Sequence, residues 1–507
     1  MTTENSLSAA RLGLRGWLVL ITLCGATFMT GLDYSIITVA LPEIGRDLGF
    51  SSASALQWVA TACLLPTAAL MPLFGRASDM VGRRRLFMAG VAGFAGLSLA
   101  AALAPSPGLL VAARAGQGVA AAMIGPTALA LMTGAFPEGP QRTRALGVNG
   151  ALLSLGFVIG TIGGGLITSG LNWRWTMLIL FGIGALVLVG AVAVVRETAG
   201  RSRTGLDVPG AVLASAGLFA LVYGVSSSEG SALTLVAAVV LLGSFLGVEA
   251  RHRAPLVPLR LLRRPTVKWG MAVGLVTFGM CGGATLLLSI YMQDVLGYSP
   301  LETGLGFLGE GVAALAGGTL AARLINARGT VATIVTGLSV QAAGTAAMVL
   351  LPVHGGLALL SVTSAAMGFG HVLTVVAAVT TITSGLDEAD QGVAGSLAQM
   401  PTFVGAIGVA GLTAIAAART EALAPSTTEA LATLGGLHAA FLAAGAVAVL
   451  GAVAGGVLLR RSDAASRGSR GRKRRGAADA PATASPVRPG RPSRPGPRRR
   501  ASAGVRR

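Results

Sequence analysis

The sequence has few charged residues. Asp, Glu, Lys and Arg make up 12% of its 507 residues, about half the roughly 25% of an ordinary soluble domain. Hydrophobic residues make up 53%, and the mean hydropathy is +0.72. Such a chain cannot cover a water-facing surface with charge, which excludes a soluble enzyme, a disordered chain, a coiled coil and a disulfide scaffold. A polytopic helical membrane protein remains.

Cysteine and catalytic patterns are also scarce. The three cysteines, Cys24, Cys63 and Cys281, lie in apolar stretches and are expected to be buried small hydrophobic residues. No CxxC pair, metal-ligand cluster or paired nucleophile and base is present, so we expect neither a cofactor nor an enzyme. No Walker motif is present either, which excludes ATP as the direct energy source.

The basic charge is concentrated in the C-terminal tail. The net charge is +19, but residues 460–507 hold 16 Lys and Arg and two acids, which gives that segment +14. We therefore expect no nucleic-acid partner. The tail, 461–507, is rich in Arg, Pro, Ser, Ala and Gly and is predicted to be disordered. It either attracts anionic lipid headgroups or is a solvated end that only reinforces the topology.

Fourteen apolar runs are long enough to cross a bilayer, which requires about 20 residues each. The first is read as a retained span, because residues 1–16 lack the features of a removed signal peptide. The runs lie at 17–41, 54–74, 84–104, 108–134, 143–168, 174–195, 208–227, 231–249, 267–292, 303–324, 330–351, 356–384, 393–418 and 437–459.

The loop charges indicate the orientation. With the N-terminus inside, one face carries 35 Lys and Arg and the other carries three, so both termini are predicted to be cytoplasmic. The layout predicts a cytoplasmic N-terminus (1–16), two six-helix halves (17–195 and 267–460) and two extra central transmembrane helices with their loops (196–266). Two such halves are typical of transporters whose substrate site lies between them.

Few ionisable groups lie within the spans, where a charge costs about 2.5–3.5 kcal/mol. Asp33 could carry a proton, bind a cationic substrate or only join helices. Arg114, with Gln117 three residues later, requires an acceptor such as Asp33. Glu310 could face a water-filled cavity or the outer headgroups. His371 could titrate near neutral pH or serve packing.

Two further sequence patterns indicate how helices contact one another. The loop GRASDMVGRRRLF (75–87) combines turn-forming glycines with an acid and arginines, and could latch two halves together. The run 149–170 carries Gly156, Gly160 and Gly164 at intervals of four. This stripe allows close helix approach, and the adjoining Gly163 and Gly165 weaken the helix.

These residues resemble the major facilitator superfamily, and within it the fourteen-span drug:proton antiporters. The resemblance runs from about residue 17 to 460. It includes the loop signature, the first-span signature LDYSIITVALP (32–42) with Asp33 at its acidic position, and NWRW (172–175), YMQDVLGYSPLETG (291–304) and DQGVAGSLAQ (390–399). The loop signature matches at Gly75, Asp79, Gly82, Arg83 and Arg84. The fourth-span signature, which the resemblance links to proton transfer, matches at Arg114, Gln117 and Gly118. The Gly156, Gly160, Gly164 and Gly165 stripe resembles the antiporter signature.

The sequence departs from the family pattern at four places. Thr161 replaces the usual proline of the antiporter signature, and Cys63 stands where an aromatic residue is common. Gly309 replaces a proline and precedes the unusual Glu310. The loop at 317–329 only faintly repeats the loop signature and lacks its acid.

The resemblance implies a secondary transporter that exports amphipathic or hydrophobic small molecules, such as antibiotics, in exchange for protons. We expect a monomer in the inner membrane of a bacterium, with a small molecule, protons and the lipid bilayer as its partners. Three alternatives remain: a dedicated transporter of one metabolite or self-made antibiotic, a non-transporting membrane sensor or scaffold, and, last, a membrane enzyme.

Overall fold

The computed structural model describes residues 13–50, 53–197, 207–226, 232–252, 255, 257–386 and 390–478, and every regular element among them is a helix. The first half contains α2 (Leu14–Leu48), α3 (Ala53–Val81), α4 (Arg83–Ala102), α5 (Pro107–Ala135), α6 (Pro140–Gly170) and α7 (Trp173–Val194). The central pair is α8 (Val208–Ser226) and α9 (Ala232–Glu249). The remaining elements are α10 (Leu259–Leu262), α11 (Pro265–Ile290), η1 (Tyr291–Val295), α12 (Pro300–Gly306), α13 (Leu308–Arg328), α14 (Thr330–Ala347), η2 (Met348–Leu350), α15 (Leu357–Thr383), α16 (Gln391–Val404), α17 (Ala406–Leu423) and α18 (Glu429–Ala478).

Every predicted span coincides with one of these helices or with a consecutive pair. Thirteen helical segments of the described chain are long and apolar enough to cross a membrane. The seventh predicted run corresponds to α8, whose apolar part, Val208–Leu221, is shorter. The predicted all-helical fold, with two six-helix halves and two extra helices between them, is confirmed; thirteen of the fourteen predicted spans are long and apolar enough to cross a membrane.

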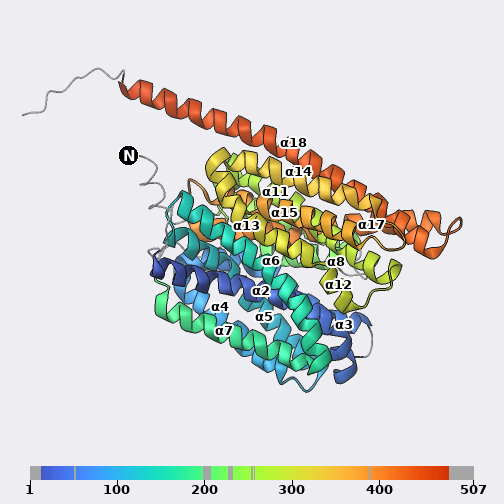
Figure 1. Ribbon diagram of the computed structural model, residues 1–507. Coiled ribbons are helices and arrows are strands. Elements are labelled where there is room, and N and C mark those ends of the chain that lie inside the picture. Colours follow the sequence, from blue (N-terminus) through green and yellow to red (C-terminus); the bar gives the residue numbers. More distant parts are fainter. Residues whose placement is uncertain are drawn as a thin grey trace, which may run out of the picture. The chain divides into compact units, whose positions relative to one another are not determined.

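The two halves each form a bundle. In Figure 1 the helices of the first half, coloured blue to green, lie in the lower part of the view, and most helices of the second half lie above them. Within the first half α2 packs on α6, and both α3 and α4 pack on α5. Within the second half α15 packs on α13 and α14. The halves meet where α6 contacts α13 and where α16 contacts α3 and α5.

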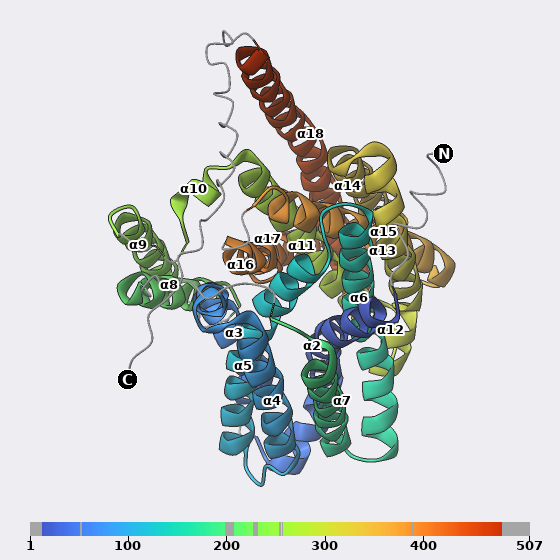
Figure 2. The ribbon, with the colours of Figure 1, turned by 90° about the vertical axis from the view of Figure 1, so that its left-hand side faces the viewer.

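The central pair, α8 and α9, packs together at one side of the bundle (Figure 2). Its contact with the first half is apolar and runs along α3. The ring of Tyr223 stacks on Trp58 at 6.1 Å and covers buried Leu65. Because α8 also contacts α17 of the second half, the central pair lies against both halves.

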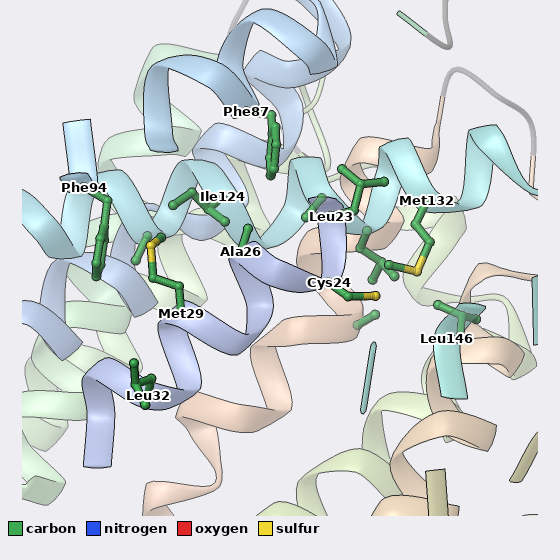
Figure 3. Close-up of a cluster of buried hydrophobic side chains, with 14 of the residues drawn as sticks. Leu23, Cys24, Ala26, Met29, Leu32, Phe87, Phe94, Ile124, Met132 and Leu146 are labelled. Atoms are coloured by element: carbon green, nitrogen blue, oxygen red, sulfur yellow. The ribbon is translucent and has the colours of Figure 1, made fainter. Parts of the chain in front are cut away.

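A core of buried apolar side chains holds the first half together. Figure 3 shows Cys24, Met29 and Leu32 of α2 among side chains of the neighbouring helices, including Phe94 of α4 and Ile124 of α5. All five are at most 3% exposed. Burying such a side chain contributes about 1.5–3 kcal/mol relative to leaving it in water, although lipid reduces this difference. The core fixes the positions from which α2 and α5 present their polar residues.

Three predicted boundaries differ from the structure. The run at 303–324 is divided between α12 and α13 at Phe307, and the run at 393–418 is divided between α16 and α17 at Gly405. The last helix continues to Ala478, where disorder is predicted from residue 461, because Ala and Arg favour helix. Residues 1–12 and 479–507 of the predicted termini lie outside the described residues.

Candidate functional site

Two ionisable groups inside the membrane spans of the first half form a buried ion pair. Arg114 on α5 donates from Nη1 to Oδ1 of Asp33 on α2, at 2.5 Å. The side chains are only 2% and 6% exposed. An arginine cannot readily deprotonate, so Asp33 supplies the counter-charge that Arg114 requires. The predicted residues, 81 positions apart, are thus brought together.

Two further helices complete the hydrogen bonding of Arg114. Its Nε donates to the carbonyl of Val59 on α3 at 3.0 Å, and Nη1 also donates to Gln117 Oε1 at 3.0 Å. Gln117 donates in turn to Ser98 Oγ on α4 at 2.7 Å. Breaking a buried pair costs about 3–5 kcal/mol, because an uncompensated charge remains. This network therefore couples four helices to the charge state of Asp33.

Cys63, a departure from the family pattern, lies at the ion pair. Its Sγ is 3.8 Å from Oδ2 of Asp33. The backbone of α3 comes close to α5 here, because a Cβ on Gly118 would lie 2.2 Å from the carbonyl oxygen of Cys63. Only glycine permits this approach. Cys63 therefore gives Asp33 a small, weakly polar neighbour.

The glycine stripe of α6 packs against α2 on both sides of Asp33. A Cβ on Gly156 would lie 2.5 Å from the carbonyl oxygen of Phe28. A Cβ on Gly160 would lie 2.0 Å from Ser35 Oγ, and one on Gly164 would lie 2.8 Å from Ile36. Gly163 has open space around it. The stripe holds the backbone of α2 against α6 near the ion pair.

The other face of α6 contacts the second half. A Cβ on Gly318 of α13 would lie 2.6 Å from the carbonyl oxygen of Gly147, and one on Gly304 of α12 would lie 2.8 Å from the methyl group of Thr161. Thr161 donates to the carbonyl of Phe157 at 3.0 Å. The residue that replaces the usual proline therefore lies at the contact between the halves, and α6 is continuous through it.

The second half contains a polar cluster that includes His371. Thr277 on α11 donates to Gln341 Oε1 on α14 at 2.6 Å, and its Oγ1 lies 3.0 Å from Nδ1 of His371 on α15. Gln341 donates back to the carbonyl of Thr277 at 3.0 Å. The ring of Phe278 meets the His371 ring edge-on at 4.9 Å. Sequence analysis identified His371 but missed its partners.

Glu310 has a different environment from Asp33. Its Oε1 accepts a long hydrogen bond of 3.5 Å from Thr285 on α11, and its buried Oε2 has no hydrogen-bond partner among the described residues. A Cβ on Gly368 of α15 would lie 2.6 Å from its Cγ. No arginine or lysine of the described chain forms an ion pair with it. Glu310 is thus available to a proton or a cationic ligand.

The loop signature lies where α3 ends and α4 begins, and we call this the signature end of the molecule. Gly82 has φ of +113°, which disfavours other residues. Arg83 donates to Oδ1 of Asp79 from Nε at 3.1 Å and from Nη2 at 2.9 Å, and both side chains are buried. The pair fixes the turn between the helices.

Arg84 ties the same turn to α7. It donates from Nε to the carbonyl of Val195 at 2.7 Å and from Nη2 to that of Val192 at 3.1 Å. The carboxylate of Glu197 accepts the backbone N–H groups of Arg83 and Arg84. Negative charge at a helix N-terminus is stabilising, so Glu197 adds an acid that sequence analysis did not include.

The halves are in close contact at the signature end. A Cβ on Gly75 would lie 2.7 Å from that of Ser396 on α16, and one on Gly392 would lie 2.6 Å from both carboxylate oxygens of Asp79. Glu138 of the first half accepts the backbone N–H of Gly385 of the second half at 2.9 Å. Gly75 and Asp79 are therefore contact residues between the halves as well as parts of a turn.

The NWRW segment joins three helices at the opposite end. Asn172 accepts the N–H of Arg174 at 2.8 Å and begins α7. Asp47 of α2 accepts from the Trp173 indole at 2.9 Å and also pairs with Arg174, which donates to the carbonyl of Ala104. The indole and guanidinium donors lower the pKa of Asp47 below its ordinary value.

No metal site is evident. Among the described side chains, no group of three or more His, Cys, Asp or Glu is arranged to hold a metal ion. The candidate site therefore consists of the Asp33–Arg114 ion pair of the first half and the Glu310 carboxylate of the second half, which forms no ion pair with a described residue. The contact between α6 and α13 joins the two halves.

A known protein family matches most of the chain. A profile of the Major Facilitator Superfamily matches residues 23–411. The chain is 42% identical to the cephamycin export protein CmcT of Amycolatopsis lactamdurans over 57% of this chain and 61% of that protein. It is 38% identical to the puromycin resistance protein pur8 of Streptomyces alboniger over 66% and 68%. The match thus spans less than two thirds of the first relative.

A solved structure shares the fold. The crystal structure of the human organic anion transporter MFSD10 (TETRAN) has a TM-score of 0.58 to this chain at 18% identity, covering 86% of this chain and 97% of that one. At this identity the likeness concerns the arrangement of helices alone.

Proposed function

The chain belongs to the major facilitator superfamily, and we propose that it exports amphipathic or hydrophobic antibiotics in exchange for protons. The observation that carries the proposal is the buried pair of Asp33 and Arg114 in a fold of this family. The relatives named above export cephamycin or confer puromycin resistance. We extend that role to this chain.

In the proposed mechanism, the Asp33–Arg114 pair responds to whether Asp33 carries a proton. A proton on Asp33 removes the charge that neutralises Arg114, so the network through Gln117 must rearrange. Because this network joins four helices, the rearrangement changes the packing of the whole half. Proton binding is thereby coupled to movement.

Glu310 and His371 are proposed to act from the second half. Glu310 has no counter-cation in the described structure and is available to a proton or to the cationic group of a substrate. His371, held by Thr277, orients the neighbouring polar cluster. We assign Glu310 to proton or substrate binding. We assign His371 to holding the cluster of Thr277 and Gln341 in place.

The halves are proposed to rock about the contact of α6 with α13. In the described arrangement the signature end is closed by α3 and α16. Separation of these helices opens a path from the cytoplasm, and their closure commits the substrate to the other side. The energy suffices: one charge that crosses about 100 mV contributes roughly 2.3 kcal/mol, equivalent to roughly a forty-fold concentration ratio.

We propose that the protein is a monomer in the inner membrane of a bacterium, with the signature end and both termini in the cytoplasm. It requires no cofactor other than the coupling proton and catalyses no covalent reaction. The extra helices α8 and α9 belong to the linker between halves 17–195 and 267–460.

The proposal is tested in inside-out membrane vesicles energised by respiration. A pH-sensitive dye reports protons in the lumen while cephamycin-type, puromycin-type and other cationic or neutral antibiotics are added. Unchanged protein is expected to release protons with some of these compounds, and Asp33→Asn is expected to release at least ten-fold fewer. Asp294→Asn, which removes an exposed acid, is the matched control.

The outcomes separate the candidates. Release with a single compound favours a dedicated exporter. Equal release by Asp33→Asn transfers the coupling role to Glu310 or His371. No release with any compound, from folded and inserted protein, contradicts broad antiport and favours a sensor or scaffold.

A further inference from the structure

Two acidic side chains outside the transport site are buried together at the signature end. Asp207 directly precedes α8, and Glu249 is the last residue of α9. They are 0% and 3% exposed. The transport mechanism uses neither of them, yet burial of a charge without a partner is costly.

In each carboxylate one oxygen accepts a hydrogen bond and the other, which we call the orphan oxygen, accepts none from the described residues. Oδ1 of Asp207 accepts the N–H of Gly210 at 2.8 Å, and Oε1 of Glu249 accepts the N–H of Val257. Oδ2 of Asp207 and Oε2 of Glu249 are buried, and no residue that the structure describes donates a hydrogen bond to either of them.

The orphan oxygens converge on the same place. A Cβ on Gly210 would lie 2.4 Å from Oδ2 of Asp207 and 3.0 Å from Oε2 of Glu249. Glycine is thus required for the pair to form. Both oxygens therefore lie close to the same point beside the backbone of Gly210.

One histidine and two arginines of the described chain lie near the pair. Nδ1 of His252 is 3.7 Å from Oδ2 of Asp207, an ion pair when the partly exposed ring is protonated. Arg251 donates to the carbonyl of Gly247 at the surface, and Arg260 on α10 is engaged with Asp390. At the far end of α8, Tyr223 packs against Leu65 and Trp58 of α3.

We propose that Asp207 and Glu249 form a proton-binding site in which one proton is shared between Oδ2 and Oε2. Two buried carboxylates this close cannot both ionise without strong repulsion. The proton supplies the donor that both orphan oxygens lack. The site is separate from Asp33 and Glu310 and does not require that either of them carries a proton.

The shared proton has a structural consequence. It joins the beginning of α8 to the end of α9, and Glu249 in turn holds the backbone at Val257, two residues before α10. Arg260 of α10 then pairs with Asp390, which directly precedes α16. Loss of the proton would separate the two carboxylates. The chain of contacts from Glu249 through α10 to α16, the helix that closes the signature end, would then be weakened.

Infrared spectroscopy of the purified full-length protein in lipid tests the proposal without substrate or gradient. The carbonyl band of a protonated carboxyl group is compared at neutral pH among the unchanged protein, Asp207→Asn, Glu249→Gln and the double variant. Both amides keep an oxygen that can accept the backbone N–H. Glu421→Gln, at an exposed position on α17, is the matched control.

One shared proton predicts that each single variant loses one band and that the double variant loses no more than either single variant. Glu421→Gln retains the band. Bands that persist in both single variants, or that are lost in only one of them, overturn the proposal. A double variant that loses twice the intensity shows two independent protonated acids and overturns sharing. Because no transport is measured, these outcomes are independent of the proposed export function.

Discussion

The Asp33–Arg114 pair contributes to stability as well as to the proposed function. Asp33→Asn leaves Arg114 buried without its counter-charge, so we expect a loss of about 3–5 kcal/mol. Asp33→Asn combined with Arg114→Gln removes both charges and is expected to recover part of that loss. Denaturant unfolding of the four proteins of this double-mutant cycle measures the coupling. Additive effects would show that the pair is energetically unimportant.

Asp47 gives the opposite end of the molecule a defined acid sensitivity. Because its pKa is lowered in the folded protein by Trp173 and Arg174, its stabilising contribution is complete above the ordinary aspartate pKa of about 4. The contribution is lost as the pH falls through the lower, folded-state pKa. The melting temperature of Asp47→Asn should therefore fall less than that of the unchanged protein between about pH 5 and 3. Parallel curves would contradict this assignment.

The principal ionisable residues were predictable at the residue scale because charges inside apolar runs are rare. Asp33, Arg114 and Glu310 were identified in this way. Their environments were not predictable, since the acceptor at Val59 is a backbone carbonyl and Ser98 is an ordinary helix residue. Only the packing of four helices brings these groups together.

Among the elements, α6 depends most on its glycines. In Gly160→Ala the new methyl group would meet Ser35 and the backbone of Leu32, so we expect a loss of about 1–3 kcal/mol from overpacking. Gly163→Ala, three residues away in open space, should be neutral or gain up to about 1 kcal/mol from helix propensity. Unfolding of both variants in the same detergent provides the comparison. Equal stabilities would contradict the close packing of α2 and α6.

The elements themselves follow from hydropathy, whereas their breaks do not. Apolar runs of about 20 residues define each span. The interruptions at Phe307 and Gly405 fall inside such runs, because apolar residues and glycines fit either a continuous or a broken helix. The pairing of α6 with α13 also depends on contacts between segments that are distant in the sequence. Sequence periodicity does not predict such contacts.

For the molecule as a whole, the proposed transport mechanism requires the halves to separate at the signature end. Gly75→Cys with Ser396→Cys, in a background in which Cys24, Cys63 and Cys281 are replaced by Ala, places two thiols at this contact. A small adjustment gives disulfide geometry. Oxidation should reduce transport at least ten-fold, and a reducing agent should restore it. Full transport by the cross-linked protein would exclude opening at this contact; the background without new cysteines is the control.

Coupling of antibiotic movement to protons is the central claim, and proteoliposomes containing the purified protein measure it most directly. A labelled antibiotic that releases protons in vesicles is supplied outside, and a pH gradient, acidic inside, is imposed. The account predicts that the compound accumulates inside above its external concentration, that collapse of the gradient abolishes this accumulation, and that Asp33→Asn reduces it at least ten-fold. Accumulation that persists without the gradient would contradict proton-coupled export.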